Sequence, residues 1–201
     1  MPHRSLIIAI LLASLSLSAS LNWLQGTTPT ASPVALAPSG GDFTLNSKDG
    51  PVSLRDFKGK VVLLYFGYTF CPDICPSSLA LVSAALHRLP PEDQKQIQPL
   101  FVSVDPERDS LDHLQQYSRY FHESFIGLTG SPDVIKSVAD SYGAAYRKVA
   151  EKSSTAYTVD HSANLYLIDT QGKLSGQLAH GTPPEEISSA LSKLLHPQTK
   201  E

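Results

Sequence analysis

The sequence predicts an α/β domain with a buried sheet, preceded by a separate uncharged segment. Residues 61–66 form a continuous run of apolar and β-branched side chains, which is typical of a strand buried on both faces. Strand-like and helix-like patterns alternate after this run, as they do in proteins whose sheet is covered by helices. Residues 5–41, in contrast, contain no Asp, Glu, Lys or Arg. We therefore expect one folded domain over residues 42–197, a usual length for a single domain.

The expected elements of this domain follow from the spacing of its apolar residues. Residues 61–66 are expected to be the central strand, and residues 77–89 a helix, because leucine and valine recur there at helical spacing. The later elements, in chain order, are a strand at 99–105, a helix at 111–121, a strand at 125–128, a helix at 132–142, a hairpin of strands 163–169 and 174–178, and a helix at 183–195. Residues 43–45 and 52–54 are expected to form an added N-terminal β-hairpin. Strands joined by crossover helices and followed by a hairpin and a closing helix predict a thioredoxin-like α/β sandwich.

The charge of the chain excludes one class of function. There are 16 Lys and Arg residues against 19 Asp and Glu residues, so the formal net charge is -3. A protein that binds nucleic acid by neutralising phosphates needs an excess of positive charge. We therefore expect no nucleic-acid partner.

The N-terminal segment predicts export from the cytoplasm. Residues 5–24 hold 14 apolar side chains out of 20, follow the basic Arg4, and are long enough to cross a bilayer as a helix. Residues 1–24 are therefore either a membrane anchor or a cleaved signal peptide, and an anchor is favoured because Trp23 suits the membrane interface. Residues 25–41, rich in Pro, Ser, Thr and Ala, are typical of a flexible tether. With Arg4 in the cytoplasm, the domain is expected on the periplasmic side of the inner membrane in a bacterial envelope.

The two cysteines of the chain, Cys71 and Cys75, are four residues apart and directly follow the central strand. At this spacing one helical turn would place both sulfur atoms on one face, and the unpaired N–H groups at a helix start favour thiolates. Two neighbouring thiolates can close into a disulfide or hold a soft metal ion such as Cu(I). A closed structural zinc site is not expected, because it needs four ligands and the chain has no second cysteine pair.

Three blocks of the sequence resemble the Sco/SenC family. The first block contains the cysteines, the second an Asp-Pro pair and the third a histidine. In chain order the blocks are Gly67-Tyr68-Thr69-Phe70-Cys71-Pro72-Asp73-Ile74-Cys75-Pro76, Val102-Ser103-Val104-Asp105-Pro106-Glu107-Arg108-Asp109 and Asp160-His161-Ser162. The blocks occur in the order found in that family, and the similarity extends from about residue 41 to the end of the last helix. The cysteine block is the specific one, and the other two carry little weight alone.

The resemblance implies a membrane-tethered metallochaperone with a thioredoxin fold that serves assembly of the dinuclear copper site of cytochrome c oxidase subunit II. It implies that Cys71, Cys75 and His161 bind one copper ion per domain, as Cu(I) or Cu(II). The ligand types agree with this, because two thiolates suit Cu(I) and an added imidazole accommodates Cu(II). The implied partners are subunit II, other copper chaperones or thiol reductants, and the membrane through the N-terminal segment.

Two further observations concern His161. It lies just before an apolar strand, where a thioredoxin-like fold brings the chain opposite the cysteines. Thioredoxin-like oxidoreductases resemble one another in a cis-proline at about this place, whereas this chain has no proline between Pro132 and Pro183. An imidazole there completes a metal site, which favours metal binding over general disulfide exchange. The other histidines of the chain are interpreted as solvated side chains.

Two other functions stay open. Redox-active Cys71 and Cys75 would make the chain a thiol-disulfide oxidoreductase that keeps the target cysteines reduced, so an enzymatic activity beside the chaperone role is an alternative. A thiol peroxidase is less favoured, because Thr69 stands two residues before Cys71 rather than three and Tyr65 occupies the place of a proline found in that class.

Asp105 has two interpretations. Its carboxylate can orient a metal ligand or help a partner to dock. Alternatively, Asp105 and Pro106 end the strand, and Asp109 or Ser110 caps the helix that follows.

Overall fold

The computed structural model describes residues 38–150 and 157–197 of the chain. The expected anchor or signal peptide at residues 1–24 lies outside these residues, as does the expected tether at 25–41 apart from residues 38–41. In the described part of the chain, no helix is long and apolar enough to cross a membrane.

A five-stranded sheet lies at the centre of the domain, in the order β5-β4-β3-β8-β9. Its strands are β3 (Val61–Gly67), β4 (Ile97–Ser103), β5 (Ile126–Leu128), β8 (Leu165–Ile168) and β9 (Leu174–Leu178). β3 and β5 both run parallel to β4, whereas β8 is antiparallel to its neighbours β3 and β9. This arrangement confirms the predicted thioredoxin-like sandwich, with the strand expected at 61–66 in its centre.

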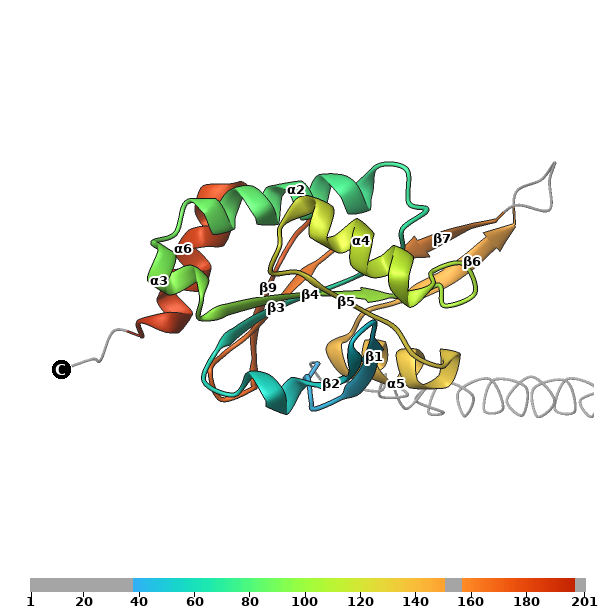
Figure 1. Ribbon diagram of the computed structural model, residues 1–201, viewed down its shortest axis with the longest axis horizontal. Coiled ribbons are helices and arrows are strands. Elements are labelled where there is room, and N and C mark those ends of the chain that lie inside the picture. The colour runs from blue at the N-terminus through green and yellow to red at the C-terminus, as the bar shows by residue number, and fades with distance from the viewer. Residues whose placement is uncertain (1–37, 151–156, 198–201) are drawn as a thin grey trace, which may run out of the picture. The chain divides into compact units, whose positions relative to one another are not determined.

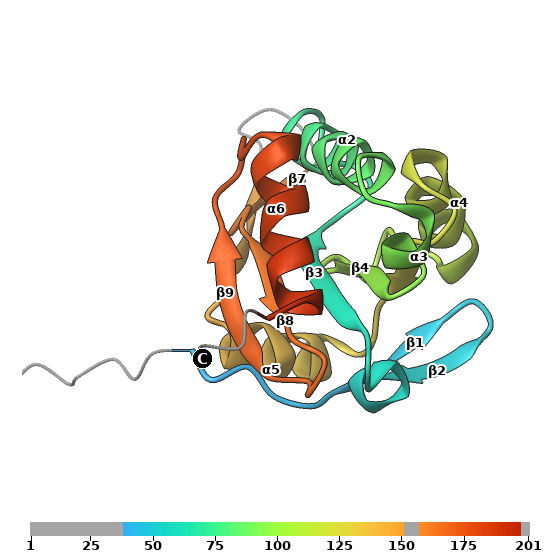
Figure 2. The same ribbon diagram turned by 90° about the vertical axis from the view of Figure 1, so that its left-hand side faces the viewer.

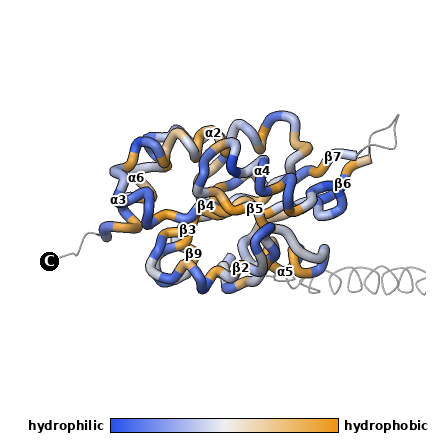
Figure 3. Tube along the Cα trace, viewed as in Figure 1, coloured by the Kyte–Doolittle hydropathy of each residue, from blue (hydrophilic) through white to orange (hydrophobic). Residues whose placement is uncertain are grey.

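The continuous apolar run of the central strands is explained by burial on both faces. Every residue of β3 and of β4 is buried, and Figure 3 shows hydrophobic residues along the central strands, whereas the helices carry both hydrophobic and hydrophilic residues. Removing a core side chain of this kind, for example by Leu63→Ala, costs about 2–5 kcal/mol. β3 is therefore a rigid support for the loop that follows it.

Helices cover both faces of the sheet. α2 (Ile74–His87), α4 (Leu111–Phe121) and α6 (Pro184–Leu195) lie on one face, and α5 (Pro132–Tyr142) lies on the other (Figure 1). Figure 2 shows α6 lying against α2, with which it makes extensive contact. A short helix that the sequence did not predict, α3 (Pro91–Gln94), joins α2 to β4.

Two hairpins lie outside the main sheet. β1 (Thr44–Ser47) pairs with β2 (Gly50–Ser53), which leads into the 3-10 turn η2 (Leu54–Phe57), and this is the expected N-terminal hairpin. The second hairpin, β6 (Tyr146–Ala150) with β7 (Tyr157–His161), was not predicted. It forms a separate two-stranded antiparallel sheet, so that His161 is the last residue of a strand.

The helix after the central strand begins earlier than predicted, and this changes the setting of the cysteines. α2 starts at Ile74 rather than at residue 77, so Cys75 lies inside its first turn. Asp73, at the N-cap, has backbone angles of φ -143° and ψ -62°, and its side chain makes no capping hydrogen bond. Cys71 precedes this residue. The expected closeness of the two sulfurs is found, but the cysteines do not share one helical turn, because the non-helical Asp73 lies between them.

Candidate metal centre

The two cysteines lie where β3 passes into α2. Cys75 is the second residue of the helix and is completely buried, whereas Cys71 lies in the preceding turn and is 9% exposed. The backbone N–H of Cys75 donates to Sγ of Cys71 at 3.4 Å, so the start of the helix holds the sulfur that lies outside it. Both cysteines are free thiols. The turn therefore presents two unoxidised sulfur atoms side by side.

Gly67, the last residue of β3, leaves the space that the Cys75 sulfur occupies. A Cβ atom at this position would lie 2.6 Å from Sγ of Cys75 and 2.8 Å from the ring of Phe101. A larger residue would therefore displace the sulfur. Gly67 was not singled out from the sequence, although a glycine that ends an otherwise bulky buried strand indicates a close approach of this kind.

His161 completes a group of three potential ligands. Its Nε2 lies 3.3 Å from Sγ of Cys75, and the ligand atoms of Cys71, Cys75 and His161 all lie within 4.8 Å of one another. On the other side of the ring, Nδ1 lies 3.1 Å from the carbonyl oxygen of Ser162. A proton on Nδ1 donates to that oxygen and leaves the lone pair of Nε2 facing the sulfurs. The fold thus brings together the three residues selected from the sequence.

The two thiols differ in acidity. The pKa of Cys71 lies well below its ordinary value because the Cys75 thiol donates to its sulfur; His161 and backbone N–H groups act in the same direction, against burial. The pKa of Cys75 is raised because the Cys71 sulfur holds its proton and because the side chain is buried. The pair therefore shares one proton at neutral pH, with the negative charge on the more exposed Cys71. A soft cation is attracted by this charge and displaces the remaining proton.

Two tyrosines hold the imidazole opposite the cysteines. The rings of Tyr65 and Tyr68 meet the His161 ring edge to face, with centroids 6.2 Å and 5.8 Å away. The Tyr65 hydroxyl lies 3.8 Å from Sγ of Cys75, and the Tyr68 hydroxyl accepts the backbone N–H of Val159 at 3.3 Å. Burial raises the pKa of both phenols, so they stay neutral. These contacts fasten β7 to the strand and loop that carry the cysteines.

A buried carboxylate secures the cysteine loop from the other side. Asp109 is 1% exposed and accepts hydrogen bonds from the backbone N–H of Thr69 at 3.1 Å, from the Thr69 hydroxyl at 2.5 Å and from the Ser103 hydroxyl at 2.5 Å. It thereby ties the loop after β3 to the end of β4. The sequence suggested Asp109 only as a helix cap, and that role belongs to Ser110, which accepts from the backbone N–H of His113.

Comparison with known proteins identifies the family. The family model described as SCO1/SenC matches residues 32–196 of the chain. The chain belongs to the SCO1/SenC family. The resemblance of the three sequence blocks to Sco/SenC proteins is thus confirmed over most of the chain.

Relatives of this Sco/SenC chain come from mitochondria and from bacteria. Protein SCO1 homolog 1, mitochondrial, of Arabidopsis thaliana is 44% identical over 144 residues, which are 71% of this chain and 42% of that protein. The SCO2-like protein of Rickettsia felis is 39% identical over 154 residues, 76% of this chain and 75% of that protein. The crystal structure of Arabidopsis thaliana ScoI with copper bound is 39% identical, with a TM-score of 0.71, and the match covers 78% of this chain and 97% of that one. The chain thus spans less than half the length of the first relative. Its group of two sulfur atoms and one imidazole fits a copper ion.

Asp105 positions the hairpin of this Sco/SenC chain. The side chain is fully buried and accepts the Tyr157 hydroxyl at 2.8 Å and Nε of Arg108 at 2.5 Å. The Arg108 guanidinium also donates to the carbonyl oxygen of Tyr157 and lies over its ring, 3.8 Å from the centroid. Because Tyr157 begins the strand that ends in His161, Asp105 helps to position this candidate ligand through the hairpin. The structure thus shows a positioning contact beyond the strand-ending turn.

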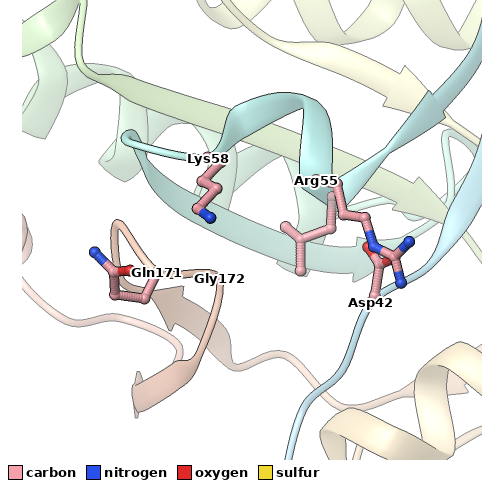
Figure 4. Close-up of a pocket in the computed structure, with 6 residues that line it drawn as sticks. Asp42, Arg55, Lys58, Gln171 and Gly172 are labelled. Carbon is pink, nitrogen blue, oxygen red and sulfur yellow. The ribbon is translucent and has the colours of Figure 1, made fainter.

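A groove opens beside the candidate ligands. It has a volume of about 440 Å³, and its lining includes Cys71, His161, Pro72 and Ile74. Phe70, just before the cysteines, is 55% exposed. Cys71, although largely buried, therefore borders an open groove. A separate pocket of about 350 Å³ lies between η2 and the β8–β9 turn, where Asp42, Arg55, Lys58, Gln171 and Gly172 line it (Figure 4), and it shares no residue with the candidate metal centre.

Proposed function

We propose that this Sco/SenC chain binds one copper ion through Cys71, Cys75 and His161 and delivers it to the dinuclear copper site of subunit II during assembly of cytochrome c oxidase. The approach of two thiol sulfurs and one imidazole nitrogen to within 4.8 Å of one another is the observation that supports the proposal most directly. The copper-bound structure of a relative supports the choice of metal. Membership of the family supports the link to the oxidase.

The donor set suits both oxidation states of copper. Cu(I) prefers soft thiolates, which Cys71 and Cys75 supply once the shared proton has left. Cu(II) gains more from nitrogen, which the Nε2 atom of His161 supplies. The Ser162 carbonyl keeps the proton of that ring on Nδ1, so that no rearrangement is needed when the metal binds.

The same site suits release of the metal. Three protein ligands leave copper open to a further donor, and the groove at Cys71 provides the approach. A thiolate of the acceptor protein can therefore bind the ion before Cys71 and Cys75 let it go. We propose that the target offers such thiolates and docks over the exposed Phe70.

Metal binding by the purified, reduced protein tests the first half of the proposal. We expect one Cu(I) per chain in a competition titration, and Cys71→Ser or Cys75→Ser should abolish tight binding because a hydroxyl is a poor ligand for a soft ion. His180→Ala is the matched control, since its ring contacts Ser78 rather than the cysteines. Wild-type affinity in either cysteine variant would reject the site.

Transfer of the metal tests the second half. The copper-loaded protein is mixed with the soluble copper-binding domain of subunit II, and formation of the dinuclear centre is followed by its absorption. We expect transfer from the wild-type protein and none from Cys71→Ser. Normal copper binding without any transfer would reject the proposed delivery to subunit II, but it would not reject the proposed copper site.

A specific observation also favours the alternative, a thiol-disulfide oxidoreductase. Cys71 has a lowered pKa and partial exposure, as an attacking thiolate requires, and Cys75 is placed to resolve the mixed disulfide. In that reaction the two thiols lose two electrons and two protons, which reduce a disulfide of the target. Only copper binding needs His161. Full reductase activity in His161→Ala, together with unchanged affinity for both Cu(I) and Cu(II), would favour the oxidoreductase.

We propose further that residues 1–24 anchor the chain in the inner membrane of a bacterial envelope, that residues 25–41 tether it, and that residues 42–197 work on the periplasmic side. The uncharged character of residues 5–41 supports this location. An anchored donor would meet a membrane-bound oxidase in the plane of the same bilayer.

A further inference from the structure

A pair of histidines lies on the helical face of the domain, where α2 and α4 end. His87 is the last residue of α2, and His122 is the C-cap of α4 (Figure 1). Their ring centroids are 5.0 Å apart, with the rings inclined at 73°. The three metal-centre residues identified above take no part in this pair. From the sequence both histidines were interpreted as solvated side chains, so their proximity is a finding of the structure.

The separation of the rings matches that of two imidazoles bound to one metal ion. A metal lies about 2.0–2.1 Å from an imidazole nitrogen and therefore about 3.2 Å from the ring centroid. Two rings that meet a metal at angles between right-angled and tetrahedral then have centroids about 4.5–5.2 Å apart. The observed separation of 5.0 Å falls in this interval.

Local contacts set the proton positions of the two rings. Nδ1 of His87 lies 2.8 Å from the carbonyl oxygen of Ser83, to which it can only donate, so Nε2 carries a lone pair. Nδ1 of His122 accepts the backbone N–H of Ser124 at 3.3 Å, so in the metal-free protein the neutral ring carries its proton on Nε2. A metal ion at Nε2 requires this proton to move to Nδ1, where the Ser124 hydroxyl, 2.8 Å away, can accept it. Partners of this kind fix ligand histidines in metal sites. Burial and the neighbouring His87 also lower the pKa of His122, which keeps its ring neutral.

Ser83 holds the two helix ends together. Its hydroxyl donates to the carbonyl oxygen of Phe121, the residue before His122, at 2.6 Å. Its own carbonyl accepts from His87. One residue therefore sets the position of both rings.

The electrostatic surroundings favour a cation. Two helix C-termini meet here, and their free carbonyl groups carry partial negative charge. Glu123 follows His122 and adds a negative charge, whereas the cation of Arg88 is partly offset by Glu185, 3.6 Å away. An open groove of about 650 Å³ along His87, Ser83 and Tyr120 gives access.

We propose that His87 and His122 form a second metal site, which binds a divalent ion of borderline softness and prefers Cu(II) to Zn(II). Imidazole nitrogen suits both ions, and Cu(II) forms the more stable complexes. The two helices supply two ligands, and water completes the coordination. This inference does not rest on the proposed copper-delivery function, because it uses none of the same ligands.

The test uses the full chain with the first site removed. The background carries Cys71→Ser, Cys75→Ser and His161→Ala, together with His3→Gln, which takes away an imidazole close to the terminal amine. Cu(II) is titrated into this protein by equilibrium dialysis, and the bound ion is examined by electron paramagnetic resonance. We expect one Cu(II) per chain with a nitrogen splitting pattern from two imidazoles.

Further substitutions in that background assign the ligands. His87→Gln or His122→Gln should each weaken Cu(II) binding by at least about tenfold and remove one nitrogen from the spectrum, and Ser124→Ala should weaken it about tenfold through His122. His113→Gln, an exposed histidine on α4, should change nothing. His87 is itself exposed, so its variant keeps the fold; its thermal unfolding without metal verifies this. Unchanged binding in His87→Gln, or an equal loss in His113→Gln, would overturn the proposal.

Discussion

Among the buried groups, Asp109 is the one whose removal should most strongly destabilise the cysteine loop. The change to be made is Asp109→Ala, which removes three hydrogen bonds accepted from Thr69 and Ser103 at 2.5–3.1 Å. Hydrogen bonds to a charged group contribute about 1.5–3 kcal/mol each, and part of this is offset by the cost of burying the carboxylate. Asp109→Ala removes the charge itself and leaves three donors of Thr69 and Ser103 without their acceptor, at about 1–3 kcal/mol for each donor that stays buried and unpaired, which after this offset amounts to a net cost of about 3–5 kcal/mol. We expect a loss of stability in this range.

The assay is urea unfolding of the reduced, metal-free protein, followed by circular dichroism. Asp140→Ala is the matched control, because its carboxylate is exposed and pairs only with Lys136 one helical turn away, a contact worth about 0.3–0.5 kcal/mol. The change should also weaken copper binding, since Thr69 lies two residues before Cys71. A loss below about 1 kcal/mol for Asp109→Ala, the range of an exposed pair, would refute the role assigned to the carboxylate.

Three other outcomes are expected. His161→Ala should weaken Cu(II) binding far more than Cu(I) binding, because two thiolates satisfy Cu(I); equal losses in paired titrations would contradict the assigned division of ligands. Alkylation of the metal-free protein, mapped by mass spectrometry, should modify Cys71 even at pH 5–6, because its pKa is lowered and the thiolate persists until the pH falls to that lowered value; Cys75, whose pKa is raised, should react slowly throughout. The mature protein should sediment with membranes and need detergent for extraction, and a soluble form beginning near residue 21 would show instead that the segment is a cleaved signal.

Much of the fold could be predicted from local patterns. The helices at 111–121 and 132–142 have the predicted bounds, and β3, β8 and β9 lie where apolar runs placed them. The β6–β7 hairpin was not predicted because its strands are short and expose polar side chains, such as those of Arg147 and Lys148 in β6. Such strands carry little hydrophobic signal, and their pairing depends on contacts with other elements.

The residues of the candidate metal centre were predictable from the sequence to different degrees. Cys71 and Cys75 are near each other in the sequence, so their spacing alone suggested a joint role. His161 is 86 residues from Cys75 and was chosen through the family resemblance. Gly67 and Asp109 were not recognised, because a close approach and a buried hydrogen-bond acceptor appear only when distant strands are in place. The pairing of His87 with His122 depends in the same way on how two helices end.

The location of His161 on its own small sheet has a consequence for how the centre works. The two sulfurs belong to the rigid junction of β3 and α2, whereas the nitrogen belongs to a two-stranded hairpin, and such hairpins have little stability of their own. The hairpin is fastened to the rest of the domain by the contacts of Tyr157 with Asp105 and Arg108, by that of Val159 with Tyr68, and by the burial of Val159. If these contacts were broken, the imidazole would leave the sulfurs while the core stays folded. Under the proposed copper-binding function, a partner that opened the hairpin would therefore turn a three-coordinate ion into a two-coordinate one without touching the sulfurs.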